Sequence, residues 1–325
     1  MKLKVLHLNY NDKKSGAAVA VNRIHECLKK NGVVSKVLVA KKTDNDNDFI
    51  GPSSTFEEIK WKLLLSINRK FEKLEKKTKY DSNSYNLIPN NVVKKINKLD
   101  FDIVNLHWIG NNLIPINQIS KINKKIVWTL HDMWPYTGSE HYANTDRFEN
   151  GYLKNNKPDF IKRLDVDRFI WNLKKKHYPK NMFIVPTSNW QEKNIKKSIL
   201  LKNYNFKKIN LPINQNFWKP IDKLYARKLI GLPENKKIIL IGSDNLNSIR
   251  KGNYLIENIL KHVKEKNLHL LIFSNVNKTK ILDNFEKTIF NSVKTDSIDL
   301  KMLYSASDVY LAPSLQESFG QTVLE

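Results

Sequence analysis

The chain has 325 residues, of which 41% are hydrophobic and only one is cysteine, and its formal net charge is +24. This length is typical of two packed domains, and a single cysteine excludes an intrachain disulfide framework and a cysteine-based metal site. The sequence has no secretory leader pattern and no apolar run near the roughly 18 residues of a membrane span, so we expect a cytoplasmic protein whose only possible membrane contact is peripheral, on the inner face.

The positive charge is concentrated in the first two thirds of the chain. Residues 1–218 hold 40 basic and 20 acidic side chains, whereas residues 219–325 hold 16 and 12. A field of this sign favours polyanions such as nucleic acid, an anionic membrane surface or a phosphorylated lipid. The alternative is a lysine-rich solvated surface without such a partner, and composition alone does not decide between the two.

Strand and helix patterns alternate along residues 1–218. A buried strand is predicted at 3–8, and a helix follows from the turn at Ser15 to about Lys30, with one apolar face formed by Ala17, Ala20, Ile24 and Leu28. Further strands rich in β-branched residues are predicted at 33–40, 101–107, 126–130 and 182–186.

Two stretches interrupt this alternation. Residues 56–79 form a basic amphipathic pattern with apolar positions at Phe56, Ile59, Leu63, Ile67 and Leu74. Such a helix either packs on the domain core or contacts an anionic membrane interface. Residues 138–176 show no clear period until a basic helix is predicted from about residue 160.

A domain boundary is predicted between residues 210 and 222, where a strand-like segment at 211–214 leads into a linker. Strands are then predicted at 237–241, 268–273, 288–293 and 308–312, and helices at 253–264, up to about 285 and at 300–306. The fold class is therefore α/β, with two doubly wound Rossmann-like domains at 1–218 and 219–325. Ligands of such sheets bind at the carboxyl ends of the strands, in a cleft between the domains.

The last nine residues hold two glutamates, Glu317 and Glu325, with Ser318-Phe319-Gly320 directly after the first. If Gly320 opens a helix, Glu317 lies in the loop before it and Glu325 lies about one and a half turns into it. A helix N-terminus offers N–H donors and a partial positive charge, so one acid is suited to sugar hydroxyls and the other to a ribose diol. The alternative is a surface helix with two solvated acids.

A basic pair, Arg250 and Lys251, precedes Gly252 at the predicted start of a helix. Arginine grips two oxygens at once and lysine supplies a point charge, so the pair suits a diphosphate. A solvated pair is the alternative. Gly16 occupies the equivalent turn of the first domain, where it either lets a ligand approach the backbone or allows tight packing. Neither turn has the glycine pattern of a dinucleotide fingerprint or of a P-loop.

His107 and His131 each end a predicted strand. A neutral imidazole at that position suits a sugar hydroxyl or a leaving phosphate oxygen, and a structural His131–Asp132 pair is the alternative. Asp-x-Asp triplets at 100–102 and 165–167 have the ligand type for Mg²⁺ or Mn²⁺. The first lies at the amino end of a strand and the second in a basic helical stretch, so we expect no metal site.

These segments, in this order, resemble retaining glycosyltransferases of the GT-B fold, family 4, and within it a bacterial branch that makes surface polysaccharides. The resemblance covers nearly the whole chain and rests on residues 104–109, residues 127–138, Arg250-Lys251-Gly252 and the two-glutamate motif Glu317–Glu325. It implies a hexosyltransferase-like, metal-independent enzyme without a cofactor. The implied partners are a nucleotide-diphosphate sugar as donor and a saccharide or lipid-linked saccharide as acceptor, with no nucleic acid.

The resemblance also implies a role for each matching position. Gly16 would lie near the donor phosphates and the acceptor, and His131 would face the transferred sugar. Arg250 and Lys251 would bind the diphosphate. Glu317 would bind the donor-sugar hydroxyls, beside the backbone of Ser318, Phe319 and Gly320. Glu325 would bind the ribose, and the main chain at Ser292 and Val293 would contact the base. The catalytic residues would be His131, Lys251 and Glu317, and the transferred sugar would keep its anomeric configuration.

Two features depart from the resemblance. Many relatives carry cysteines shortly after the segment that begins at His131, whereas this chain has Phe148-Glu149-Asn150-Gly151 there. The chain also stops at Glu325, before the further strand and long helix of a complete second domain, so we expect that domain to be incomplete. The alternative functions are an inactive truncated transferase and a non-catalytic polyanion-binding α/β protein.

Overall fold

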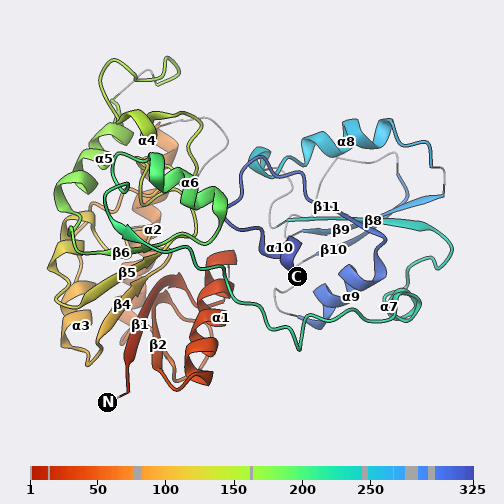
Figure 1. Cartoon of the computed structure of the whole chain (residues 1–325), viewed down its shortest axis with the longest axis horizontal. Helices are drawn as coiled ribbons and strands as arrows, with labels where there is room; N and C mark the ends of the chain where they lie inside the picture. The colour runs from red at the N-terminus through yellow and green to blue at the C-terminus, as the bar shows by residue number, and fades with distance from the viewer. Residues whose placement is uncertain are drawn as a thin grey trace. The chain divides into compact units, whose positions relative to one another are not determined.

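The computed structural model describes residues 2–13, 15–75, 82–161, 164–243, 248–265, 267–274, 285–291 and 297–325. The chain divides into two compact units, an N-terminal unit (Met1–Pro212) and a C-terminal unit (Ile213–Glu325) (Figure 1). This division falls a few residues before the boundary predicted after residue 218. In both units the described strands pair in parallel.

The sheet of the N-terminal unit has seven strands in the order β3-β2-β1-β4-β5-β6-β7. The strands are β1 (Lys4–Asn11), β2 (Val34–Lys41), β3 (Phe49–Ile50), β4 (Ile103–Leu106), β5 (Lys125–Thr129), β6 (Phe183–Val185) and β7 (Asn205–Phe206). The helices are α1 (Gly16–Lys30), α2 (Thr55–Glu75), α3 (Val92–Lys98), the 3-10 helix η1 (Ile116–Lys121), α4 (Arg147–Asn150), α5 (Val166–His177) and α6 (Asn189–Lys197). The five predicted strands are confirmed, and the two-residue strands β3 and β7 are too short to show a period in the sequence.

Both faces of this sheet are covered (Figure 1). Successive side chains of a strand point to opposite faces, and the apolar side chains of β2 therefore need a packing partner on each face. Val37 and Val39 face one side, where Val21 of α1 packs on them. Leu38 points to the other side, into the main core of the unit, which also contains Ile96 of α3. Near-continuous apolar strands of this kind are typical of a doubly wound parallel sheet.

Two helices of the N-terminal unit differ from their predicted form. Of the predicted apolar face of α1, Ala20 is buried, whereas Ala17, Ile24 and Leu28 are only partly buried. The other buried residues of this helix include Ala18, Val21 and His25. The hydroxyl of Ser15 caps the helix by accepting from the Ala18 N–H at 3.1 Å. Ala18, Val21 and His25 are spaced at i, i+3 and i+7, so they lie on one face of the helix. Helix α5 begins at Val166 and not near residue 160, because the Asp165 carboxylate caps it by accepting from the Arg168 N–H.

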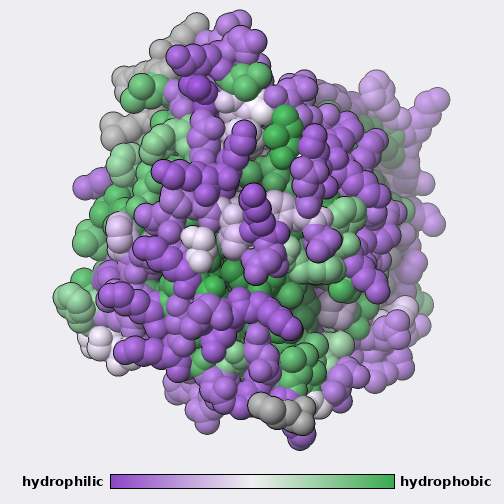
Figure 2. Space-filling model, turned by 60° about the vertical axis from the view of Figure 1, so that its left-hand side comes forward, coloured by the Kyte–Doolittle hydropathy of each residue, from purple (hydrophilic) through white to green (hydrophobic). Residues whose placement is uncertain are grey.

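Helix α2 also buries a different face from the predicted one, and the predicted end of this helix at residue 79 lies outside the described residues. Trp61 and Leu64 are buried, whereas the side chains of Phe56, Ile59 and Leu63 are 78%, 57% and 57% exposed. The predicted apolar face is therefore not the packing face at these three positions. Hydrophobic residues are likewise exposed among hydrophilic ones on the face drawn in Figure 2.

The C-terminal unit has a four-stranded sheet in the order β10-β9-β8-β11. Its strands are β8 (Lys237–Ser243), β9 (Leu268–Ser274), β10 (Lys287–Asn291) and β11 (Val309–Leu311). Its helices are α7 (Lys223–Leu229), the 3-10 helix η2 (Ile249–Lys251), α8 (Tyr254–Lys261), α9 (Ile298–Ala306) and α10 (Gln321–Leu324). Most of the helix predicted to end near residue 285 lies outside the described residues.

The strand predicted at 211–214 is wrong: within the described stretch 164–243 these residues form no strand. Pro212 has no N–H to donate to a neighbouring strand, which disfavours pairing there.

Alternate residues of β8 pack on opposite sides of the second sheet. Ile238 and Leu240 lie in a core shared with Leu303 of α9, whereas Ile241 lies in a separate core with Ile256 of α8. Figure 1 accordingly shows α8 on one side of the sheet and α7 and α9 on the other.

An ion pair between the buried Arg227 side chain and the partly exposed Asp308 side chain holds the amino ends of β8 and β11. The Arg227 guanidinium donates to the Ala306 carbonyl at 2.9 Å and to Asp308 Oδ2 at 2.8 Å, and the same carboxylate oxygen accepts from the Ile238 N–H at 2.8 Å. Burial opposes ionisation of Asp308, but Lys223, the Ile238 N–H and Arg227 outweigh it and lower its pKa to about 2. This network fixes the strand ends opposite to those that carry the predicted site residues.

Candidate functional site

The strand order of each sheet reverses at one point, between β1 and β4 in the N-terminal unit and between β8 and β11 in the C-terminal unit. At such a point the connections leave to opposite faces, and the crevice at the carboxyl ends of the strands is the usual ligand site. Gly16 follows β1, Arg250 and Lys251 follow β8, and Glu317 follows β11. His131 follows β5, the neighbour of β4. The predicted residues therefore divide between two units, each at or beside its own reversal point.

In the C-terminal unit, the loop after β8 meets the loop after β11. The Lys251 ammonium pairs with the Glu317 carboxylate, and Arg250 Nη1 lies 3.6 Å from Glu317 Oε2. The Arg250 guanidinium also donates to the Gln316 carbonyl at 2.7 Å, and the main-chain carbonyl of Arg250 accepts from the Leu315 N–H at 2.8 Å. Residues 66 positions apart thus form one charged group, which we call the Arg250–Lys251–Glu317 cluster.

A glycine allows this close approach. Gly252 ends the turn of η2 in the left-handed region, at φ +68°. A Cβ atom at this position would lie 2.0 Å from the Pro313 carbonyl oxygen. Both the dihedral angle and the contact therefore demand glycine, so Gly252 is required for the two loops to meet.

The start of the two-glutamate motif has the predicted local form, since Gly320 precedes α10 and Glu317 lies in the loop before it. Glu325 directly follows the last residue of α10 and does not lie within the helix as predicted. The Ser314 hydroxyl donates to Glu317 Oε1 at 3.1 Å. Ser318 is buried, and Glu325 Oε2 accepts from the Tyr304 hydroxyl at 3.3 Å. The predicted base-binding residues Ser292 and Val293 lie outside the described residues.

In the N-terminal unit, His131 is half-buried and lies against a second histidine. Its Nε2 shares a hydrogen bond with His107 Nδ1 at 2.9 Å, and the two rings stack with centroids 5.1 Å apart. Burial lowers the pKa of His131 to about 4, although the nearby Asp132 charge opposes this shift. His131 is therefore a neutral hydrogen-bonding group near pH 7, as a contact with a sugar hydroxyl requires.

Asp132 bonds a different histidine, which sequence reasoning missed. Its Oδ2 lies 2.5 Å from His141 Nδ1, and His141 Nε2 lies 2.9 Å from the Ser84 hydroxyl. This order of groups matches a nucleophilic triad, but all three side chains are buried, and the Ser84 oxygen already accepts from the Asn111 N–H at 3.0 Å. Asp132, His141 and Ser84 therefore hold the loop that follows His131, and they offer no exposed nucleophile.

A buried lysine completes the support of this loop. The Lys174 ammonium, on α5, donates to the carbonyls of Trp134, Thr137 and Gly138, the last two at 3.2 and 2.6 Å. It also lies 3.8 Å from the centre of the Trp134 ring. Burial lowers the pKa of Lys174 to about 7 in spite of nearby carboxylates. In the sequence this lysine is one of three in a row, so nothing marked it as buried.

The four aspartates of the two Asp-x-Asp triplets all bond protein groups. The contacts are Asp100 with the Lys4 ammonium, Asp102 with the Lys4 N–H, Asp165 with the Arg147 guanidinium, and Asp167 with the Ser139 N–H and hydroxyl.

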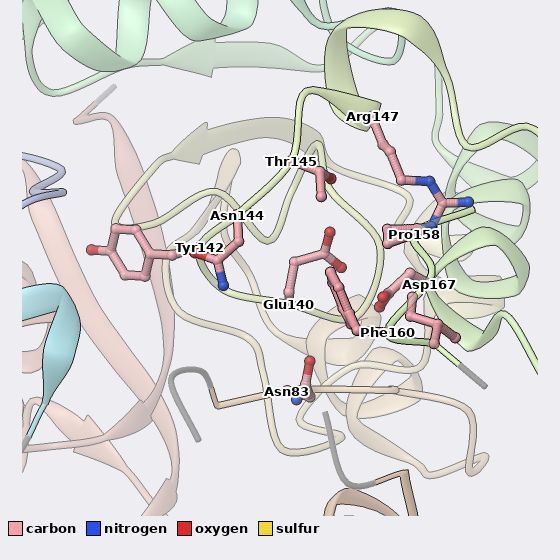
Figure 3. A pocket seen from close by; sticks show the side chains of 10 residues that line it. Asn83, Glu140, Tyr142, Asn144, Thr145, Arg147, Pro158, Phe160 and Asp167 are labelled. Carbon is pink, nitrogen blue, oxygen red and sulfur yellow. The ribbon is translucent and has the colours of Figure 1, made fainter. Parts of the chain in front are cut away.

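A small pocket also lies in the N-terminal unit, and none of the predicted site residues lines it (Figure 3). In Figure 3 the Glu140 side chain lies between Asn83 and Thr145. Two carboxylates and one guanidinium give the pocket a mixed charge that selects no ligand class. The lining residues are Asn83, Glu140, Tyr142, Asn144, Thr145, Arg147, Pro158, Phe160, Ile161 and Asp167.

No family model matches this sequence. The chain is 30% identical over 131 residues to a glycogen synthase of Clostridium perfringens, a match that covers 38% of this chain and 26% of that enzyme. The chain thus matches about a quarter of the length of this curated relative.

Two solved structures are similar over almost the whole chain. The first is sucrose-phosphate synthase of Thermosynechococcus elongatus, with a TM-score of 0.63, 15% identity, and coverage of 98% of this chain and 77% of that one. The second is HepE of Anabaena in complex with UDP-glucose, with a TM-score of 0.56, 14% identity, and coverage of 99% and 77%. These similarities confirm the predicted fold class, which is that of GT-B glycosyltransferases.

Replacing Lys174 with methionine tests the support of the loop after His131. Methionine keeps much of the side-chain length but leaves three buried carbonyls without their donor, so the free energy of unfolding of the N-terminal unit should fall by roughly 3 kcal/mol, about 1 for each bond. Urea denaturation measures this change. The matched control is Lys176→Met at an exposed position of the same helix, which should change stability by less than about 0.5 kcal/mol, and equal effects of both substitutions would reject the role given to Lys174.

The buried histidines predict how the stability of the N-terminal unit depends on pH. In the folded chain, burial lowers the pKa of His7 to about 3 and that of His131 to about 4. Below pH 6.5 the unfolded chain binds protons that these rings exclude. The free energy of unfolding should therefore fall as the pH is lowered from 6.5 to 5. The decrease should be up to about 1.4 kcal/mol per pH unit for each histidine. Urea titrations across this range measure the slope, His7→Asn should make it shallower, and a slope of zero would contradict the prediction.

Proposed function

We propose that this chain is a retaining glycosyltransferase of family 4. It moves a sugar from a nucleotide-diphosphate sugar to a saccharide or a lipid-linked saccharide in the synthesis of a bacterial surface polysaccharide. The similarity to a glycogen synthase and the GT-B fold support sugar transfer. HepE, which has this fold, was solved with UDP-glucose, and this supports a nucleotide sugar as the donor.

The observation that carries the proposal is the Arg250–Lys251–Glu317 cluster at the reversal point between β8 and β11. Two cations there suit a diphosphate, and a carboxylate beside them suits the hydroxyls of the attached sugar. In the proposed reaction the bond between the anomeric carbon and the diphosphate oxygen breaks, and a bond to the acceptor oxygen forms on the same face. The acceptor proton passes to the leaving diphosphate. Because Arg250 and Lys251 are both positively charged, they stabilise the negative charge of the departing diphosphate without a metal ion.

His131 and Gly16 would contribute from the N-terminal unit. A neutral imidazole at His131 suits a donor-sugar hydroxyl, and the start of α1 at Gly16 offers backbone N–H groups to an anion. Glu325 would bind the ribose, beside Tyr304. In this proposal Lys251 and Glu317 act on the bond that breaks, and His131 orients the sugar.

Replacing Lys251 with alanine should weaken nucleoside-diphosphate binding by roughly 10- to 100-fold, because one charge-assisted contact of about 1.5–3 kcal/mol is lost. Calorimetric titration of the wild type and the variant with UDP, GDP, ADP and TDP measures this change. Lys261→Ala, at an exposed position near the end of α8, removes the same charge from the same unit and should leave the affinity unchanged.

The proposal fails at the phosphate site if Lys251→Ala binds the nucleotide as tightly as the wild type. If none of the four nucleotides binds, but nucleic acid binds with an affinity that falls steeply with salt, the chain is the polyanion-binding alternative.

We also propose that the acceptor is reached at the inner face of the cytoplasmic membrane, through α2. The exposed side chains of Phe56, Ile59 and Leu63 recur at i, i+3 and i+7, so they form one apolar stripe. Exposed cations at Lys62 and Arg69 accompany it. Apolar residues beside cations suit an anionic lipid interface. No helix within the described part of the chain has both the length and the hydropathy to cross a bilayer.

Replacing Phe56, Ile59 and Leu63 together with serine should reduce binding to phosphatidylglycerol vesicles by at least about tenfold, since the inserted apolar area is lost. Co-sedimentation of protein with vesicles measures the binding. The matched control replaces Leu224 and Leu229 with serine, because both are exposed apolar residues of α7. Wild-type binding by the triple variant, or equal loss in both variants, would reject α2 as the contact.

A further inference from the structure

Three histidines of the N-terminal unit form a continuous hydrogen-bonded series. His7 Nδ1 lies 2.9 Å from His107 Nε2, and His107 Nδ1 lies 2.9 Å from His131 Nε2. The rings of each neighbouring pair have centroids 5.1 Å apart. His7 lies on β1, and the other two directly follow β4 and β5, so the series crosses three adjacent strands of the sheet.

The backbone holds the middle ring in place. The His107 N–H donates to the Leu8 carbonyl at 3.0 Å, and the His107 carbonyl accepts from the Trp128 indole at 3.2 Å. His107 is therefore fixed to the strands on both of its sides. Its ring has little freedom to leave either neighbour.

All three rings are neutral near pH 7. Burial lowers the pKa of His7 to about 3, that of His131 to about 4, and that of His107 well below its usual value. A neutral imidazole carries one proton, on either Nδ1 or Nε2. His107 can therefore donate to only one neighbour and must accept from the other.

This rule leaves two arrangements for the whole series. In the first, every ring carries its proton on Nε2, and His131 donates to His107, which donates to His7. In the second, every ring carries its proton on Nδ1, and the direction of donation is reversed. The protonation of His131 is thus tied to that of His7, two strands away.

The far end of the series favours the second arrangement. His7 Nε2 is buried and has no hydrogen-bond partner among the described residues. Its ring neighbour His25, at a centroid distance of 6.4 Å, directs its own Nδ1 to the Ser35 hydroxyl. A proton on His7 Nε2 would be a buried donor without an acceptor, which is unfavourable and is rarer in proteins than an under-used acceptor.

We propose that His7 and His107 are positioning residues that hold His131 as a neutral imidazole with its proton on Nδ1. Since Nε2 of His131 accepts from His107, any hydrogen bond that a ligand makes to the polar atoms of this ring is one that Nδ1–H donates. His131 then acts as a hydrogen-bond donor to a ligand oxygen and not as a base. The ligand itself, a sugar hydroxyl or a phosphate oxygen, rests on the proposed function.

Nitrogen-15 NMR of the histidine rings tests this assignment directly. In ¹⁵N-histidine-labelled full-length chain without ligand, the His131 signals should show a protonated Nδ1 and a hydrogen-bonded, unprotonated Nε2. His131→Asn identifies these signals by removing them. A wild-type His131 that is protonated on Nε2, or on both nitrogens at neutral pH, would overturn the proposal.

Two amide substitutions at His107 test the direction of the series. The amide nitrogen of asparagine takes the place of Nδ1, so His107→Asn still donates to His131 and should keep the wild-type His131 spectrum. The amide of glutamine takes the place of Nε2, so His107→Gln leaves His131 without its donor, and proton exchange between its two nitrogens should appear. A His107→Gln spectrum identical to that of the wild type would refute the role of His107.

The same logic applies at His7, where asparagine should preserve the His131 spectrum and glutamine should not. If a glutamine variant does not fold, the wild-type spectrum alone still decides the assignment. The readout needs neither donor nor acceptor. Failure of nucleotide binding therefore counts against the proposed function, whereas a wrong protonation state of His131 counts against this inference alone.

Discussion

Parallel pairing of β8 with β11 is the constraint on which the candidate site depends. Parallel strands end at the same edge of a sheet, and β8 and β11 are neighbours although β9 and β10 lie between them in the sequence. The loops that follow them must therefore meet, and Gly252 removes the last obstacle to their contact. Once the sheet forms, Arg250, Lys251 and Glu317 come together without any further device.

Exposure decides what this cluster can do. The Lys251 and Glu317 side chains remain 27% and 32% exposed, and ion pairs with access to water contribute only about 0–1 kcal/mol. A diphosphate can therefore replace the carboxylate as the partner of both cations at little cost. By contrast, the Arg147–Asp165 pair is only 3% and 12% exposed. Separating it would leave a buried charge, so that pair is structural.

Patterns that repeat along the chain were predictable from the sequence, whereas long-range partners were not. The apolar strands at β1, β2, β4 and β5 are continuous enough to mark a buried parallel sheet. The helix start at Gly320 and the Arg250–Lys251 pair were found from local spacing. The buried roles of His7 and Lys174 depend on which residues lie opposite them, and no local pattern shows this. Helix α2 shows the same limit, because two apolar faces compete for the core and only packing decides between them.

The most direct measurement of the central claim is a crystal structure of the chain with a bound nucleoside diphosphate. The diphosphate oxygens should lie within hydrogen-bonding distance of Arg250 and Lys251, and Glu317 should have exchanged its lysine partner for the ligand. A diphosphate bound elsewhere, with the Lys251–Glu317 pair intact, would contradict the claim.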